Sequence, residues 1–110
     1  MSDATSLHRL LKIKAGAAKR LMKENRLYQK EEESLKQKLD KFIADGAENW
    51  DIKNTRNMME ESHRLVEDTA KRLGGATQDL REAIVASQKV LPSDDVELAT
   101  ANGILQEISI

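Results

Sequence analysis

Six cationic side chains recur on one face of the N-terminal segment, and they are the residues best placed to do chemistry. They are Arg9, Lys12, Lys19, Lys23, Arg26 and Lys30. Spacings of three, four and seven residues put them on the outward face of a helix, with Gly16 as the single gap. No acidic residue interrupts this basic stripe, so its chemistry is electrostatic, and it suits docking onto an acidic surface. The alternative interpretation is an ordinary solvated helix face.

Groups that could support catalysis or metal binding are scattered along the chain. His8 and His63 are the two histidines, and we expect both at the surface of different helices rather than as ligands. Residues 31–33 and 60–61 are acidic runs typical of a solvated helix face. General acid–base catalysis needs carboxylates of shifted pKa in a pocket, which a thin helical hairpin does not offer. The absence of cysteine excludes a thiolate metal site. Because no catalytic triad, phosphate-binding loop or metal-ligand spacing is visible either, we predict no enzyme, no metal site and no cofactor.

Composition favours long solvated helices. Of 110 residues, 34 % are charged, 3 % are aromatic and one is proline, which indicates a single domain over 1–110 rather than a sheet or a thick core. No apolar run approaches the roughly 18 residues that span a bilayer. No leader is recognised at the start, so we expect a cytoplasmic protein without membrane contact.

Charge is distributed unevenly along the chain. Residues 1–30 carry a net charge of +6 and residues 31–110 a net charge of −7. This asymmetry can steer a charged partner to one end. A pI near 6.1 and the scarcity of aromatic residues argue against a nucleic-acid partner.

The stretch 45–51 predicts a tight turn between two long helices, at about 3–44 and about 52–90. Gly46 follows a long helical pattern and is expected to cap the first helix, since glycine adopts left-handed backbone angles at little cost. Asn49 and Asp51 are expected to cap the second helix.

Heptad spacing assigns an apolar seam to each long helix. The first seam comprises Leu7, Leu11, Lys14, Ala18, Leu21, Asn25, Tyr28, Glu32, Leu35, Leu39 and Phe42. The second comprises Ile52, Thr55, Met59, Ser62, Val66, Thr69, Leu73, Ala76, Leu80, Ala83, Ser87 and Val90. Folding at the turn pairs Leu21 with Leu73, Asn25 with Thr69 and Glu32 with Ser62.

Pro92 ends the second helix, and a third is predicted at about 94–109, capped by Ser93 or Asp94. The predicted fold is therefore all-α, an elongated antiparallel three-helix bundle with two long helices and one shorter C-terminal helix. The third helix can cover only the half of the hairpin that contains both chain ends.

The uncovered half keeps apolar residues beside its seam, including Leu27, Ile43, Met58 and Leu65. They are either scattered surface side chains, which are normal, or a contact surface for another chain. Under the second hypothesis Met58 and Leu65 join the basic stripe as partner-binding residues. Gly74 and Gly75 are expected to allow a mild bend.

Four stretches in order resemble the tubulin-binding cofactor A family. They are LKIKAGAAKRLMKE (Leu11–Glu24), YQKE (Tyr28–Glu31), DGAENWDIK (Asp45–Lys53) and ESHRLVEDTAKRL (Glu61–Leu73). The resemblance implies a three-helix bundle that captures β-tubulin, a strongly acidic partner, during tubulin folding and heterodimer assembly without ATP or catalysis. It also implies association with the cytoskeleton and with other tubulin-folding cofactors. Family members often carry a proline where this chain has Glu67, so we expect an unbroken helix there, with any bend at Gly74–Gly75.

A second function class stays open. A structural coiled-coil adaptor, or a self-associating helical module, would share the seams and have no tubulin role. A monomer and a weak homodimer are both compatible with the sequence.

Overall fold

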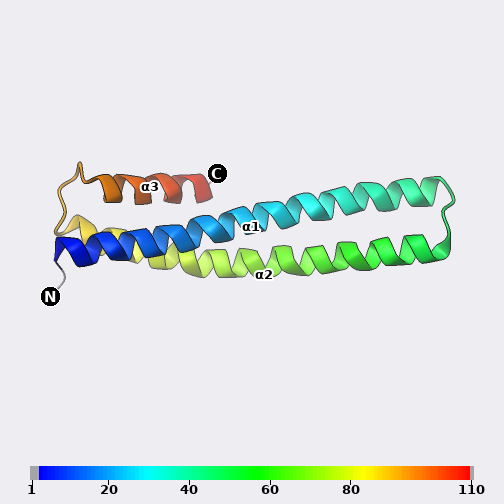
Figure 1. Ribbon diagram of the computed structural model, residues 1–110, viewed down its shortest axis with the longest axis horizontal. Helices are drawn as coiled ribbons and strands as arrows, with labels where there is room; N and C mark the ends of the chain where they lie inside the picture. Colours follow the sequence, from blue (N-terminus) through cyan, green and yellow to red (C-terminus); the bar gives the residue numbers. More distant parts are fainter. Residues whose placement is uncertain (1–2, 110) are drawn as a thin grey trace. The chain divides into compact units, whose positions relative to one another are not determined.

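The protein consists of three α-helices in a computed structural model that describes residues 3–109. Helix α1 spans Ala4–Ala44, α2 spans Asn49–Gln88 and α3 spans Val96–Ser109 (Figure 1). The described residues contain no strand. The predicted all-α class, with two long helices and a shorter C-terminal one, is confirmed.

The turn between α1 and α2 is a Schellman motif. Gly46 adopts a φ of 69°, the Ala47 N–H donates to the Phe42 carbonyl at 2.9 Å and the Gly46 N–H to the Ile43 carbonyl at 3.3 Å. The predicted glycine cap is therefore confirmed. The predicted caps of α2 are wrong, because the helix already begins at Asn49 and Asp51 lies inside its first turn. There the Asp51 carboxylate favours the positive end of the helix dipole.

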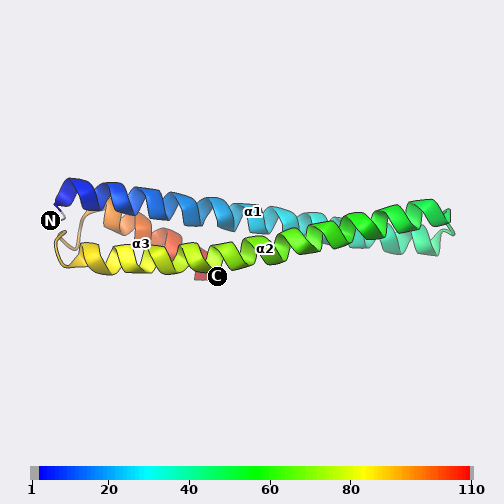
Figure 2. The same cartoon turned by 90° about the horizontal axis from the view of Figure 1, so that it is seen from below.

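The chain divides into two compact units. One, the three-helix unit, comprises residues 3–22 and 71–109 of the described chain; the other, the hairpin unit, comprises residues 23–70. Within each unit, segments of α1 and α2 run antiparallel side by side (Figures 1 and 2).

The core of the three-helix unit draws on all three helices. Its buried members are Leu7, Leu11, Ala15, Ala18, Leu80, Ala83, Ile84, Leu91, Leu98, Ala101 and Ile104. Alanines at the contacts allow the helices to approach closely. A second row beside the predicted seam, containing Ala15, Ile84 and Leu91, is buried as well, because α3 widens the covered face. Among the predicted seam residues of this unit, Lys14, Leu73 and Ala76 are half-buried, and Val90 has 54 % of its surface exposed.

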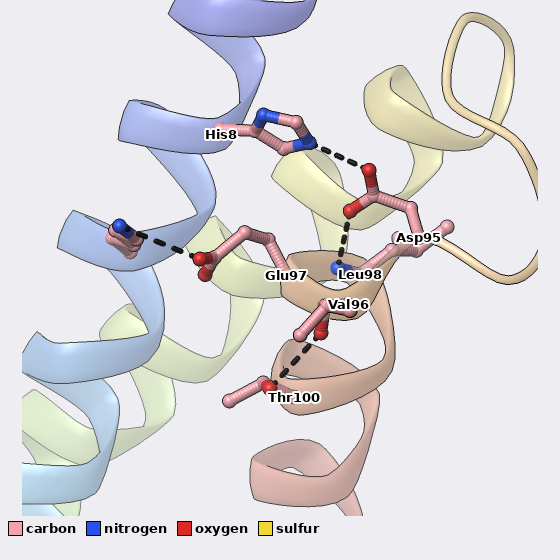
Figure 3. Close-up of polar contacts among 7 residues, drawn as sticks. His8, Asp95, Val96, Glu97, Leu98 and Thr100 are labelled. Atoms are coloured by element: carbon pink, nitrogen blue, oxygen red, sulfur yellow. Dashed lines mark hydrogen bonds and ion pairs between the residues drawn. The ribbon is translucent and has the colours of Figure 1, made fainter.

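Asp95 caps α3 and also ties it to α1. Its Oδ1 accepts the Leu98 N–H at 3.1 Å, and its Oδ2 accepts His8 Nε2–H at 2.6 Å (Figure 3). The pKa of Asp95 is lowered, first by the hydrogen bond from His8. The expected cap at Ser93 or Asp94 is wrong by one or two residues. His8, expected at the surface of its helix, has a side chain that is 36 % exposed and also contacts Asp95.

The hairpin unit is held by a polar layer in its seam. Asn25 Nδ2 donates to Thr69 Oγ1 and to the Val66 carbonyl, both at 3.0 Å. This confirms the predicted pairing of Asn25 with Thr69 and hence the register. Glu32 was predicted to pair with Ser62, but its carboxylate accepts a hydrogen bond from His63, the residue that follows Ser62. Ser62 is buried beside it.

Helix α2 continues without interruption past Glu67 and through Gly74–Gly75, which confirms the expected unbroken run at Glu67. A Cβ atom added at Gly74 or Gly75 would meet nothing within 4 Å. Close packing of α3 therefore does not explain these glycines, and the bend at this position stays a prediction.

Candidate docking surface

An apolar groove of about 750 Å³ lies between α1 and α2 in the hairpin unit. Leu35 of α1 and Met58 and Leu65 of α2 supply its apolar lining, and the charged lining residues are Lys30 and Glu31 of α1 and Glu61 of α2. Met58 is 47 % exposed, and Leu35 and Leu65 are half-buried. Two helices alone cannot close over these side chains, so the groove stays open to solvent.

Helix periodicity explains why these residues meet. Met58 and Leu65 are seven residues apart, so they lie on one face of α2, and Lys30 and Leu35 lie on neighbouring rows of α1. The structure therefore brings together three of the predicted site residues, Lys30, Met58 and Leu65. Leu35 had been assigned only to the seam. The signal that it also lines a groove was its position in the half without a third helix.

The basic stripe differs between the two units. In the hairpin unit Lys23, Arg26 and Lys30 are all exposed, and Lys30 also borders the groove. These three side chains and the groove form one candidate docking surface.

In the three-helix unit part of the stripe is used inside the protein. Lys12 Nζ lies 3.4 Å from Glu97 Oε1 of α3. Lys19 is half-buried and Arg9 is exposed. Lys12 therefore has an acidic neighbour within the protein, although its side chain stays 66 % exposed.

A second hollow of about 540 Å³ in the hairpin unit has a different character. Its lining includes Glu32, Lys36, Glu60 and His63. His63 Nδ1–H donates to Glu32 Oε2 at 2.6 Å, and Nε2–H donates to Glu67 Oε1 at 2.9 Å. The hydrogen bond to Glu32, followed by the charges of Glu32 and Glu67, raises the pKa of His63. This hollow is charged and internally paired, so it offers less apolar contact than the groove.

Neither histidine belongs to a metal centre. Across residues 3–109 no group of three histidine, cysteine or acidic side chains is arranged to hold a metal ion. Over the same residues no helix is long and apolar enough to cross a membrane. Trp50, the single tryptophan, is 71 % exposed in the first turn of α2, an exposure that was not predicted from the sequence.

The fold and the site define an all-α helical protein with an open apolar groove and basic side chains beside it. The family model of tubulin binding cofactor A matches residues 6–105. The chain therefore belongs to the tubulin-binding cofactor A family, whose members are non-enzymatic tubulin-folding chaperones.

Individual relatives agree with this assignment. The chain is 35 % identical over 102 residues to tubulin-specific chaperone A of Rattus norvegicus, covering 93 % of both chains. It is 30 % identical over 100 residues to tubulin-folding cofactor A of Arabidopsis thaliana, covering 91 % of this chain and 88 % of the relative.

Two solved structures share the fold. The crystal structure of tubulin folding cofactor A from Arabidopsis thaliana superposes with a TM-score of 0.87 at 28 % identity, covering 96 % of this chain and 97 % of the other. Human tubulin chaperone cofactor A gives a TM-score of 0.82 at 30 % identity, covering 94 % and 99 %. Both support the predicted three-helix bundle.

Proposed function

We propose that this protein captures β-tubulin as a non-catalytic chaperone in the assembly of the tubulin heterodimer. The observation that carries the proposal is the family match over residues 6–105, which includes most of α1, all of α2 and ten of the fourteen residues of α3. Its relatives are named tubulin-specific chaperones and tubulin-folding cofactors.

Lys23, Arg26 and Lys30 would attract the acidic surface expected of tubulin. They are exposed side chains, and opposite charges on a partner accelerate diffusional encounter. Salt screens such charges beyond about 8 Å at physiological ionic strength. The apolar groove with Met58 and Leu65 would then supply the desolvated contact that slows dissociation.

The test is the rate at which purified, immobilised β-tubulin binds the protein at two salt concentrations. Lys23→Glu combined with Lys30→Glu should slow association by about tenfold, the lower end of electrostatic steering, and should flatten the salt dependence. The matched control is Lys53→Glu with Arg56→Glu, which changes the net charge equally at exposed positions of α2 in the same unit. Equal association rates for both double variants would contradict the role of the stripe, and failure of the wild-type protein to bind would contradict the proposal itself.

The same proposal covers location and partners. It places the protein in the cytoplasm with the cytoskeleton and makes other tubulin-folding cofactors its further candidate partners. A monomer or weak homodimer is expected.

Exposed apolar side chains in the hairpin unit favour one alternative, a self-associating helical module or coiled-coil adaptor. They are Leu27, Ile43, Trp50 and Met58, each 47–71 % exposed. Sedimentation that shows a stable dimer, together with no binding of β-tubulin, would support that alternative.

A further inference from the structure

The dimensions of the groove match a short helical segment. On α2 its lining extends from Asn57 to Leu65, and on α1 from Lys30 to Leu35. Eight steps of 1.5 Å give a length of about 12 Å, which corresponds to a little more than two helical turns. Its volume of about 750 Å³ leaves room for several side chains.

The walls of the groove determine which backbone conformation an occupant can take. Lys30–Leu35 and Asn57–Leu65 lie inside long α-helices, whose backbone N–H and C=O groups are paired within the helix. The groove therefore offers an extended peptide no ladder of backbone partners. Backbone groups of a bound segment that are turned toward these walls need partners within the segment itself, and an α-helix supplies them.

The three-helix unit shows how a helix meets the α1–α2 pair. There α3 inserts Leu98, Ala101 and Ile104, spaced by three residues, among buried side chains of α1 and α2. This 14-residue helix is thereby held on the pair. No segment among residues 3–109 fills the groove of the hairpin unit in the same way.

The charged side chains around the groove indicate where an occupant would carry residues of opposite charge. Lys30 borders the groove, and Lys23 and Arg26 lie on the same face of α1 within the two preceding turns. Acidic residues along one flank of a bound helix would meet these cations. Glu31 on the α1 wall and Glu61 on the α2 wall also line the groove, so basic residues of the occupant suit the positions that face these two carboxylates.

We propose that this groove binds an amphipathic α-helix of β-tubulin that places apolar residues at positions i, i+3 or i+4, and i+7, with an acidic flank toward Lys23, Arg26 and Lys30. The inference rests on the proposed function and goes further by naming the kind of client segment that is bound. Met58 suits this contact because its unbranched thioether adapts to irregular apolar surfaces.

Photo-crosslinking identifies the occupant directly. p-Benzoylphenylalanine replaces Met58 in the full chain, the complex with purified β-tubulin is irradiated, and the cross-linked peptides are identified by mass spectrometry. The expected cross-links recur every three or four residues in one segment of β-tubulin that carries acidic residues. The control replaces Val85, which is 54 % exposed on the same helix in the other unit. It should give at least tenfold fewer cross-links.

Cross-links at every second residue would indicate an extended segment and overturn the inference, as would cross-links to a second copy of this chain. Met58→Gln and Leu65→Gln should each speed dissociation from β-tubulin by about tenfold, whereas Val85→Gln should not change it. If the wild-type protein binds β-tubulin but the groove variants dissociate at its rate, the inference fails and the proposed function stands. If the wild-type protein does not bind, the proposed function fails first. Unchanged helical circular dichroism confirms that each variant is folded.

Discussion

Replacing both Gly74 and Gly75 by alanine should stabilise the protein. Both residues lie in the interior of α2 and are exposed. Among the described glycines only Gly46 has a positive φ, so neither Gly74 nor Gly75 needs the left-handed conformation. An added Cβ at either position meets nothing within 4 Å. The substitution therefore introduces no clash and removes the entropic cost of glycine in a helix.

The expected size follows from helix propensity. Alanine is favoured over glycine in a helix interior by about 1 kcal/mol, so the two substitutions together should add about 2 kcal/mol to the free energy of unfolding. For a domain of about 100 residues this raises the Tm by roughly 8 °C. The same chemical change at Gly46 should act in the opposite direction. Its φ of 69° is left-handed, and an alanine there costs roughly 1–2 kcal/mol.

Thermal and urea unfolding followed by circular dichroism measure both effects on the full chain. A loss of stability in Gly74→Ala/Gly75→Ala would refute the reasoning, because it would mean that α2 needs a non-helical conformation at this point. Binding of β-tubulin by the same variant tests the predicted bend. If bending at these glycines is required, the variant should be more stable and bind more weakly, whereas unchanged binding would show that the bend is dispensable.

Three further predictions concern the core, the charged hollow and the dimensions of the chain. Leu11→Ala and Leu80→Ala remove side chains that are 1 % and 0 % exposed, so each should lower the free energy of unfolding by about 2–5 kcal/mol. Leu73→Ala should lower it by less, because Leu73 is only half-buried, and equal losses for the three variants in urea denaturation would contradict this difference in burial. Because the pKa of His63 is raised, its stabilising contribution is fully present below about pH 6.5 and is lost as the pH rises through that raised value. The urea midpoint should therefore fall as the pH is raised from 6 to 9. The imidazole faces Glu32 and Glu67, and Lys36, Glu60 and Arg64 lie beside it. His63→Gln should abolish this pH-dependent fall of the midpoint, and an unchanged fall would assign it to another group. The two long helices have 41 and 40 residues, which corresponds to about 60 Å each. Small-angle scattering should therefore give a radius of gyration well above the roughly 13 Å of a compact 100-residue domain. A value near 13 Å would contradict the predicted elongation.

Periodicity along one helix was sufficient for much of the fold. The seam residues Leu11, Asn25 and Leu80 are buried as predicted, because a heptad repeat alone determines which side of a helix faces its partner. Gly46 was equally readable, since a left-handed residue after a long helix strongly favours glycine. These are local properties, and they need no knowledge of how the helices approach one another.

Side-chain contacts between different helices could not be predicted from the periodicity of one helix. The sequence favoured Ser93 or Asp94 as the cap of α3, but the chain enters α3 so that Asp95 caps it and also reaches His8, 87 residues away. Lys12 belongs to the basic stripe, yet its neighbour is Glu97 of α3. Such pairings depend on how far each helix is rotated and on where a loop delivers the next one.

The candidate docking surface shows the same division. The sequence indicated that Lys30 points outward and that Met58 and Leu65 lie beside a seam in a half without a third helix. Their meeting around one groove, with Leu35 on the opposite wall, required the two helices to be placed against each other. Helical periodicity specifies the direction of a side chain about its own axis, whereas a groove is formed by the distance and rotation between two axes.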